Sequence, residues 1–344
     1  MSLIIHAPNI HQGGGKALLL PLLEAARKQG SVRVILDKRL TVPASLIDGL
    51  TAVRVRPSIL GRLAGEWTLR SWVKETDTVL CFGNLPPLFH VKGKVVVFLQ
   101  NRYLLTKLPL QGFPWRTRMR IRVERLCLSR RIRRADTVVV QTPSMRQEVF
   151  ASLGVPSRLL PFCASCLDYR RSMARIETRG ATLYDFVYVA TGEPHKNHWT
   201  LLEAWRLLAV DGLRPSLCLT IPEDRFPQLV AAIRRVSGEH SLRIENRVFS
   251  LKDLQTLYTQ AGTLIYPSLT ESLGLPLIEA RAAGLPIIAG ELDYVRDVVD
   301  PEETFDPQSP VSLARAVKRF LGQEEPALPL LRPEEFLQSI VANH

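Results

Sequence analysis

The sequence predicts an α/β protein made of two doubly wound domains, each built on a parallel sheet. Short apolar segments of strand type alternate with longer segments of helical type along most of the chain, an order typical of parallel sheets covered by helices. The length of 344 residues favours two domains over one. Apolar residues make up 46% of the chain and charged residues 23%, a globular composition that excludes an intrinsically disordered chain.

The first half of the chain supplies the strands of the first predicted sheet. We expect them at Leu3–His6, Val32–Leu36, Ala52–Val55, Thr78–Phe82, Val95–Leu99 and Thr137–Val140. A predicted loop at Pro8–Gly15 ends in three glycines, and a helix with a broad leucine face is expected over Ala17–Lys28. A glycine loop before a helix N-terminus can bind an anion through backbone N–H groups; a tight turn without a ligand is the alternative.

Residues 115–134 hold nine arginines and one glutamate. Trp115, Met119, Val123 and Leu126 recur at helical spacing, so we expect a helix whose apolar face packs inward. The basic face is either solvated or meets an anionic membrane surface. The residues expected at that surface are Arg130, Arg131, Arg133 and Arg134.

A boundary between the two domains is expected in residues 164–182, which show no periodicity. The domains are therefore predicted at residues 1–163 and 183–326, with a short helix in the segment 327–344. The strands of the second sheet are expected at Val187–Ala190, Leu217–Ile221, Arg243–Phe249, Thr263–Tyr266 and Leu285–Ala289.

Residues 263–290 organise the second domain as strand, loop, helix and strand. Pro276 can open the helix and Gly284 can end it. Ligands of such units bind where the loop meets the helix N-terminus, which favours phosphate. Glu271 in the loop and Glu279 one turn into the helix would pair with sugar or ribose hydroxyls; as an alternative, Glu279 is a helix acid favoured by the dipole and Glu271 a solvated loop residue.

The motif Pro267-Ser268 … Glu271-Ser-Leu-Gly-Leu-Pro-Leu-Ile-Glu279-Ala … Gly284-Leu-Pro resembles the signature of the retaining glycosyltransferases of family 4, which have the GT-B fold. The resemblance implies two Rossmann-like domains facing each other across a cleft. The first would hold the acceptor and the second a nucleotide-sugar. It also implies that Glu271 contacts the donor sugar and Glu279 the ribose. Its loop residues Ser272, Gly274 and Leu275 are then expected at the nucleotide-sugar.

The same resemblance assigns roles outside this motif. Gly14 and Gly15 match a glycine loop that approaches the donor diphosphate or the acceptor. Lys196, in the loop Thr191–Asn197, fits a lysine that neutralises the donor phosphates, although the position of the family's accompanying arginine is unclear. Asn197 is expected beside it as a helix cap and donor-site residue.

In the family, a histidine near the donor sugar often follows the strand that we expect at Val95–Leu99. Gln100 and Asn101 occupy this region, which leaves a role copied from the histidine in doubt. Gln100, Asn101 and Arg102 remain candidates for the vicinity of the sugar or acceptor. Thr142 also matches an element that lines the cleft, with helix capping as its simpler role.

The resemblance implies a hexosyltransferase that moves a sugar, with retained configuration, from a nucleoside-diphosphate sugar to a glycan. The chain resembles members of the family that synthesise bacterial surface polysaccharides and lipopolysaccharide O-antigen, so we expect a lipid-linked acceptor. The protein would then be cytoplasmic or peripheral on the inner face of the cytoplasmic membrane. We expect no cofactor and no requirement for a metal, because the sequence has no Asp-x-Asp motif.

The formal net charge of +12 favours anionic partners, namely nucleic acid, anionic lipid or phosphorylated substrates. We expect no nucleic acid, since no binding motif accompanies the charge. The five cysteines show no disulfide framework, which suits a reducing compartment, and we take the Cys163-x-x-Cys166 spacing as incidental. We see neither a signal peptide nor an apolar run that could span a bilayer. A sugar-nucleotide epimerase of the same fold and a non-catalytic glycan- or nucleic-acid-binding protein are the alternatives.

Overall fold

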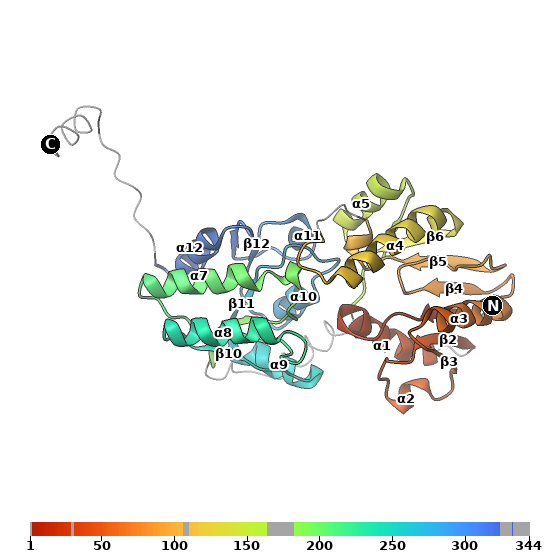
Figure 1. Cartoon of the computed structure of the whole chain (residues 1–344), viewed down its shortest axis with the longest axis horizontal. Coiled ribbons are helices and arrows are strands. Elements are labelled where there is room, and N and C mark those ends of the chain that lie inside the picture. The colour runs from red at the N-terminus through yellow and green to blue at the C-terminus, as the bar shows by residue number, and fades with distance from the viewer. Residues whose placement is uncertain (1, 29–30, 106–109, 164–181, 324–331, 333–344) are drawn as a thin grey trace.

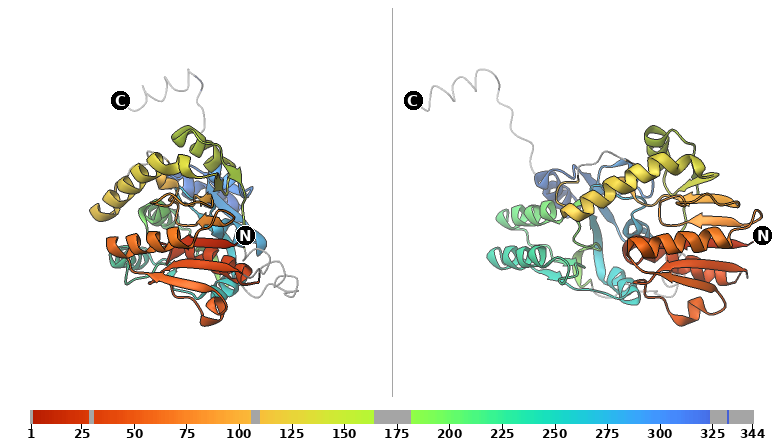
Figure 2. Two further views of the ribbon diagram at one scale, coloured as in Figure 1. Left: turned by 90° about the vertical axis from the view of Figure 1, so that its right-hand side faces the viewer. Right: turned by 45° about the vertical axis from the view of Figure 1, so that its right-hand side comes forward.

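The computed structural model has two α/β domains that lie side by side, each with its own parallel sheet (Figures 1 and 2). It describes residues 2–28, 31–105, 110–163, 182–323 and 332. The predicted α/β class with two parallel sheets is confirmed. The linker expected at 164–182 and the helix expected within 327–344 lie outside the described residues, apart from Thr182 and Arg332.

The first sheet has seven strands in the order β3-β2-β1-β4-β5-β6-β7, and every pairing is parallel. The strands are β1 (Leu3–Ala7), β2 (Val32–Asp37), β3 (Thr51–Val55), β4 (Thr78–Cys81), β5 (Lys94–Phe98), β6 (Thr137–Val140) and β7 (Arg158–Leu159). The direction of winding reverses between β1 and β4, where Leu3 of β1 pairs with both Val32 and Thr78. Ligands of open α/β sheets bind beyond the carboxyl ends of the strands at such a switch point.

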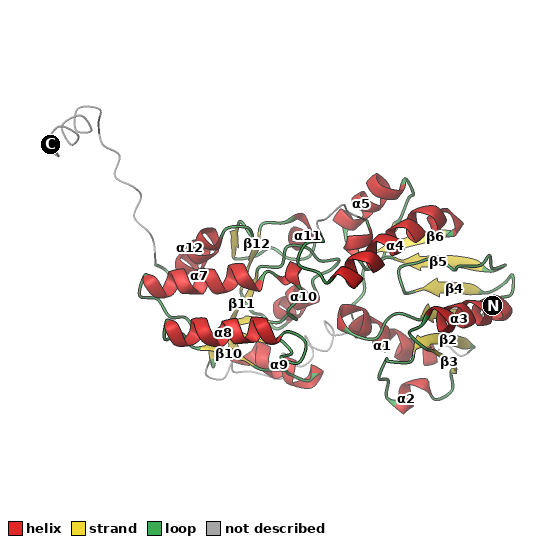
Figure 3. Cartoon of the chain, in the orientation of Figure 1, coloured by secondary structure: helices red, strands yellow, loops and turns green. Residues whose placement is uncertain are grey.

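Helices cover both faces of this sheet (Figure 3). They are α1 (Gly13–Arg27), α2 (Ala44–Ile47), α3 (Ile59–Trp72), η1 (Arg102–Leu104), α4 (Trp115–Arg131), η2 (Ile132–Arg134) and α5 (Pro143–Leu153). Side chains alternate along β1, so Ile5 packs with α1 and Ile4 packs with α3, α4 and α5. His6 follows the same alternation and lies on the face of α3 and α4.

The second sheet has six strands in the order β10-β9-β8-β11-β12-β13, again all parallel. The strands are β8 (Tyr184–Tyr188), β9 (Leu217–Leu219), β10 (Ile244–Asn246), β11 (Ala261–Tyr266), β12 (Ile287–Gly290) and β13 (Glu303–Phe305). The helices are η3 (Pro194–Lys196), α7 (His198–Val210), α8 (Pro227–Glu239), α9 (Leu251–Gln260), α10 (Leu275–Ala282), α11 (Asp293–Arg296) and α12 (Pro310–Phe320). One apolar core joins these elements, and its largest side chain, Trp205, is fully buried.

The glycines after β1 differ from the expected loop. Gly13, Gly14 and Gly15 form the first turn of α1, which begins four residues earlier than predicted. Gly13 has a φ of 64°, a left-handed conformation that glycine adopts at little cost. The loop predicted at Pro8–Gly15 is therefore confirmed for residues 8–12 and wrong for the three glycines, because low helix propensity at a first turn is outweighed by the packing of the turns that follow.

The inward apolar face predicted for residues 115–134 is also wrong. Trp115, Met119, Val123 and Leu126 are 64%, 47%, 54% and 48% exposed. The residues of α4 that enter the core are Ile121 and Leu128, which stand seven positions apart and therefore share a helical face. α4 thus has apolar side chains on two sides. One side packs in the core and the other is exposed to solvent.

The cysteines follow the expectation except at one position. Cys81, Cys127 and Cys218 are free thiols. Cys163 is disulfide-bonded, so the expectation that the cysteines carry no disulfide is wrong at this position.

Candidate active site between the domains

The loop before α10 and the first turn of that helix form the centre of the candidate site. Gly274 precedes α10 with a φ of 68°, and a Cβ at this position would lie 3.0 Å from Leu277 Cδ1. Pro276 stands in the first turn, as predicted, where its missing N–H costs nothing. The helix N-terminus carries partial positive charge, so it can stabilise an anion placed against it.

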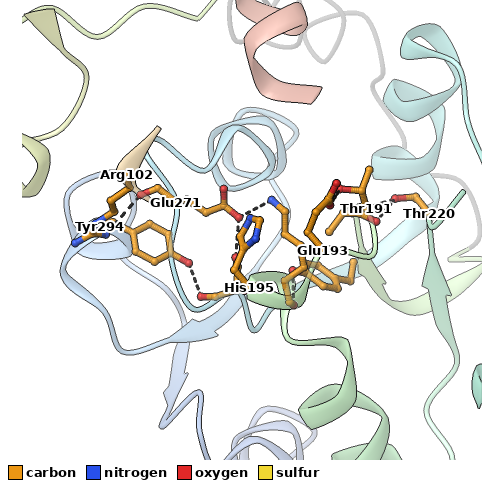
Figure 4. A network of polar contacts seen from close by, with 11 residues as sticks. Arg102, Thr191, Glu193, His195, Thr220, Glu271 and Tyr294 are labelled. Carbon is orange, nitrogen blue, oxygen red and sulfur yellow. Dashed lines mark hydrogen bonds and ion pairs between the residues drawn. The ribbon is translucent and has the colours of Figure 1, made fainter. Parts of the chain in front are cut away.

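Lys196 and Glu271 form an ion pair at this centre (Figure 4). The distance between Lys196 Nζ and Glu271 Oε1 is 2.5 Å, and Ser268 Oγ donates to the same oxygen at 2.6 Å. Burial alone would favour a protonated carboxyl, but Lys196 and the hydrogen bond from Ser268 lower the pKa of Glu271 below its ordinary value. Glu271 is therefore a carboxylate at neutral pH and an acceptor for hydroxyl donors.

Hydrogen bonds to backbone carbonyls hold the two loops that carry this pair. Tyr188 Oη donates to the Lys196 carbonyl at 2.8 Å, and Tyr294 Oη donates to the Ser268 carbonyl at 2.6 Å. Asn197 Nδ2 donates to the carbonyls of Pro267 and Pro307, at 3.1 Å and 2.6 Å. Asn197 precedes α7 as expected, but its side chain makes no capping bond to a helix N–H. Its side chain ties the loops together.

Glu279 lies in the second turn of α10 and faces α9. Tyr258 Oη donates to Glu279 Oε2 at 3.2 Å. The side chain of Glu279 is half-buried, so it remains accessible at the side of the helix. Such a carboxylate, with its orientation held by a phenol, can accept hydrogen bonds from a pair of vicinal hydroxyls.

Two of the predicted first-domain residues lie against the Glu271 loop. Arg102 forms an ion pair with Glu148, lies 3.5 Å from the carbonyl oxygen of Glu271 and stands 5.8 Å from the centroid of the Tyr294 ring. Thr142 Oγ1 donates to the Ser272 carbonyl at 3.3 Å and also caps α5 by accepting from the Met145 N–H. Thr142 thus caps α5, the simpler role that its sequence position suggested, and also contacts the loop of the second domain that carries Glu271.

Further contacts join the domains around this centre. The Ser144 N–H, in the first turn of α5, donates to Asp297 Oδ2 of the second domain at 2.8 Å. Leu275 packs against the apolar cluster of the first domain that includes α1. The rings of His195 and Tyr103 meet edge-on, with centroids 5.6 Å apart. The candidate site is therefore built from both domains.

Gln100 lies beside the glycine turn of α1. A Cβ added at Gly15 would lie 3.7 Å from Gln100 Oε1. Gln100 Nε2 donates to the Phe82 carbonyl at 2.9 Å, while its Oε1 is buried without a hydrogen-bond partner. Asn101 instead caps η1 by accepting from the Tyr103 N–H at 3.1 Å. Gln100 is therefore the better placed of the two to bind a ligand near Gly14 and Gly15.

The four arginines predicted for a membrane surface lie away from the Lys196–Glu271 centre, at the end of α4 and in η2. Arg130, Arg133 and Arg134 are exposed, and Arg131 is half-buried in a groove between α3 and α4. Arg134 Nη1 donates to the Leu88 carbonyl at 3.3 Å.

Several residues that shape the site were not predicted. Tyr188 lies in an apolar segment, whereas Tyr258 and Tyr294 lie among mixed polar and apolar residues, and neither context indicates a hydrogen bond to the site. Asp297 contacts Ser144 across 153 positions, a pairing that no local pattern reports. Ser268 is part of the recognised motif, so its hydroxyl is the one contact that the sequence could have indicated.

Comparison with known proteins supports the resemblance. Residues 171–330 match the family model described as "Glycosyl transferases group 1". The O-antigen chain mannosyltransferase B of Escherichia coli is 35% identical over 118 residues, which are 33% of this chain and 30% of that protein. The O-antigen chain mannosyltransferase RfbU of Salmonella typhimurium is 33% identical over 82 residues, which are 21% of this chain and 23% of that protein. The matches thus span less than a third of either relative.

Solved structures show the fold. Anabaena HepE in complex with UDP aligns with a TM-score of 0.68 at 16% identity, covering 94% of this chain and 90% of that chain. A sucrose-phosphate synthase from Thermosynechococcus elongatus aligns with a TM-score of 0.68 at 17% identity, covering the same shares. These neighbours have the GT-B architecture, so the predicted fold is confirmed.

Among the residues that the structure describes, no helix is both long enough and apolar enough to cross a bilayer. The same residues include no group of three or more His, Cys, Asp and Glu side chains that could hold a metal ion.

Proposed function

Because residues 171–330 match the family model of the group 1 glycosyltransferases, we propose that this chain transfers a sugar from a nucleoside-diphosphate sugar to a glycan acceptor. The proposed transfer retains the anomeric configuration, as in family 4, and serves bacterial surface-polysaccharide synthesis. The curated relatives are named as mannosyltransferases of O-antigen chains. A mannosyl group is therefore the first sugar to test.

The observation that carries the proposal is the convergence of Lys196, Glu271 and the N-terminus of α10 at one place between the domains. Negative charge grows on the diphosphate as the glycosidic bond breaks. Lys196 has three N–H donors and gives one to Glu271, so two can bind phosphate oxygens. The cation and the helix N-terminus would then stabilise the leaving group without reorganising.

The carboxylates have separate roles in this scheme. Glu271, held by Lys196 and Ser268, accepts hydrogen bonds from the hydroxyls of the donor sugar. Glu279, held by Tyr258, accepts them from the ribose. Much of the rate enhancement would come from positioning and from stabilising the phosphate charge. On this scheme no divalent metal is required.

We propose that the acceptor is a lipid-linked glycan and that the protein acts at the cytoplasmic face of an anionic membrane. Arg130, Arg133 and Arg134 support this by presenting positive charge to solvent. The exposed apolar side chains of α4 support it as well, since they can enter the interfacial layer of a bilayer next to basic residues.

A thermal-shift panel of UDP, GDP, ADP and TDP and their sugars, with and without Mg²⁺, tests the proposal. A ligand that binds only the folded chain raises its melting temperature by mass action. We expect one base to give a shift that is independent of Mg²⁺. Release of the nucleoside diphosphate should then require an acceptor glycan, whereas conversion of the donor without an acceptor would indicate an epimerase. No shift with any nucleotide would refute the donor site.

A further inference from the structure

Two glutamines lie at the ends of neighbouring strands of the first sheet. Gln100 comes two residues after β5, and Gln141 comes directly after β6. The two strands are parallel, and Phe98 of β5 pairs with Val139 of β6. Each glutamine is two positions beyond one of these partners, so the register places the glutamines at the same level of adjacent strands.

Both glutamines belong to the face of the sheet that α1 covers. Phe98 and Val139 pack in the apolar cluster that includes side chains of α1, and residues two positions apart along a strand share a face. Val140, beside Gln141, packs in the cluster of the opposite face, as this alternation requires. The first turn of α1 is close to Gln100, whose Oε1 lies 3.7 Å from the position of a Cβ added at Gly15.

The amide of Gln141 is buried and unused. The side chain is 2% exposed, and neither its Nε2 nor its Oε1 has a hydrogen-bond partner among the described residues. A primary amide offers two N–H donors and one carbonyl acceptor. Buried polar groups of folded proteins nearly always have partners, so an amide with none indicates a ligand that supplies them.

Gln100 contributes a second acceptor, whose orientation is fixed. Its Nε2 donates to the Phe82 carbonyl at 2.9 Å, which leaves its Oε1 buried and unpaired within the described part of the chain. The two amides together match a pair of neighbouring sugar hydroxyls. One hydroxyl can donate to Gln100 Oε1 while it accepts from Gln141 Nε2, and the next hydroxyl can donate to Gln141 Oε1.

The second domain meets this edge of the sheet. Thr142, the residue after Gln141, donates to the Ser272 carbonyl at 3.3 Å. Leu275, at the start of α10, packs on the cluster that includes Phe98. The two glutamines are therefore at the interface that also holds the loop of Glu271, where a sugar is proposed to bind.

We propose that Gln141, together with Gln100, binds two neighbouring hydroxyls of a sugar held between the domains. Gln141 is thereby a specificity residue, because a sugar that lacks one of these hydroxyls leaves a buried amide atom unpaired. The sugar is either the transferred one or the terminal sugar of the acceptor, since both offer the same hydroxyl chemistry. It enters while the domains are apart, because the amide is covered when they meet. The inference rests on the proposed transferase function, to which it adds the role of Gln141.

Gln141→Met tests the amide, because methionine keeps the length of the side chain and removes its N–H and C=O groups. Without ligand, this variant should melt at the temperature of the wild type or above it, since no hydrogen bond is lost. Gln100→Met should melt at a lower temperature, because the Phe82 carbonyl loses its donor. Gln228→Met on α8 is the matched control at an exposed position and should change neither melting nor binding.

Binding measurements distinguish the two sources of the sugar. GDP-mannose and UDP-glucose are compared with GDP and UDP by calorimetry, and methyl α-mannoside represents the acceptor in saturation-transfer NMR. If the transferred sugar is the ligand, Gln141→Met should weaken the nucleotide-sugar about five- to tenfold and leave the nucleoside diphosphate unchanged. If the acceptor sugar is the ligand, the variant should weaken only methyl α-mannoside by a similar factor.

The outcomes for this inference and for the transferase proposal are separable. Equal binding of every probe by wild type and Gln141→Met would overturn the inference and leave the transferase proposal standing if nucleotides bind. A melting temperature of Gln141→Met clearly below that of the wild type would also overturn it, since the amide would then have a structural bond. If no nucleotide binds but methyl α-mannoside binds through Gln141, the sugar contact stands and the transferase proposal fails. If no probe binds, both fail.

Discussion

Lys196 Nζ and Glu271 Oε1 lie 2.5 Å apart, although the two residues are 75 positions apart in the chain. Each is only about 15% exposed, so each neutralises a charge that the other would leave buried. The pair links two loops of the second domain at the interface with the first. We propose that Lys196 binds phosphate and that Glu271 binds the sugar. Each residue therefore has a role in ligand binding and also neutralises the buried charge of the other.

We expect Lys196→Met to lower the turnover number about 10²- to 10³-fold, as the loss of one preorganised donor to a developing charge does. It should also lower the free energy of unfolding by about 3 kcal/mol, because a buried carboxylate loses its partner. The double variant Lys196→Met with Glu271→Gln should recover most of that stability but none of the activity. Chemical denaturation and product release measure the two effects. Full turnover in Lys196→Met would contradict the role in leaving-group stabilisation.

Glu279→Ala should weaken nucleotide binding about 10- to 100-fold, because hydrogen bonds to a charged group contribute about 1.5–3 kcal/mol. Calorimetry with the matching nucleotide and its 2′,3′-dideoxy form separates the ribose from the rest of the ligand. Wild type and variant should bind the dideoxy form equally. Glu239→Ala on α8, where the side chain is 59% exposed, is the control. Equal losses with both nucleotides would show that Glu279 does not act through the ribose.

Much of the fold follows from local sequence patterns. β6, at Thr137–Val140, has the predicted bounds, because it is a short run of β-branched residues between polar residues. The start of α10 at the Gly274–Pro276 turn was also predictable, since glycine and proline restrict the backbone locally. Glu279 lies on α10 and Glu271 in the loop just before it, so the centre of the candidate site was within reach of the sequence.

The remainder of the site depends on contacts between distant residues. A periodic row such as Trp115, Met119, Val123 and Leu126 tells which side chains share a face of α4, but not whether that face meets the sheet. Ile121 and Leu128 fill the available space in the core, so the longer apolar row is left at the surface. Likewise, the role of Asp297 could not be predicted from the sequence. Its carboxylate contacts α5 only because the two domains lie against each other.

Asp297→Ala should loosen the contact between the two domains. The carboxylate caps the N-terminus of α5 by accepting from Ser144 N–H at 2.8 Å, and losing a cap costs about 1 kcal/mol. An equilibrium between closed and open forms would then shift about fivefold toward the open form. Small-angle scattering should report a larger radius of gyration, and turnover should fall while nucleotide affinity is kept. Asp297→Asn retains an acceptor oxygen, so its radius of gyration and turnover should lie between those of the wild type and of Asp297→Ala. An unchanged radius and turnover would leave the contact without a role in closure.

His198 should make the protein less stable in acid. The side chain is 2% exposed, neither ring nitrogen has a hydrogen-bond partner, and the ring lies 4.9 Å from that of Tyr188. Burial and the charge of Lys196 lower the pKa of His198 to about 3. Below pH 6.5 the unfolded chain takes up a proton at this residue that the folded chain refuses. Stability is therefore lost as the pH falls from 6.5 toward 3, by about 1.4 kcal/mol per pH unit.

His198→Phe keeps a ring against Tyr188 and removes the titration. The melting temperature of this variant should fall less steeply between pH 6.5 and 4 than that of the wild type, with little difference at pH 8. Parallel curves for the two proteins would mean that His198 takes up its proton in the folded state as readily as in the unfolded chain.

Replacing Arg130, Arg131, Arg133 and Arg134 by Ser should weaken binding to vesicles that contain anionic lipid. Each basic residue near such a surface contributes about 1 kcal/mol, so partial contact alone predicts at least a tenfold loss in cosedimentation at low salt. The matched control removes the same charge from the second domain at four half-exposed or exposed positions: Arg206, Arg234, Arg235 and Arg243. If net charge alone drives adsorption, the two variants will lose binding equally. If α4 and η2 form the contact, only the first variant will lose vesicle binding. Trp115→Ser should then weaken the binding that remains at high salt, because the apolar contribution persists after the charges are screened.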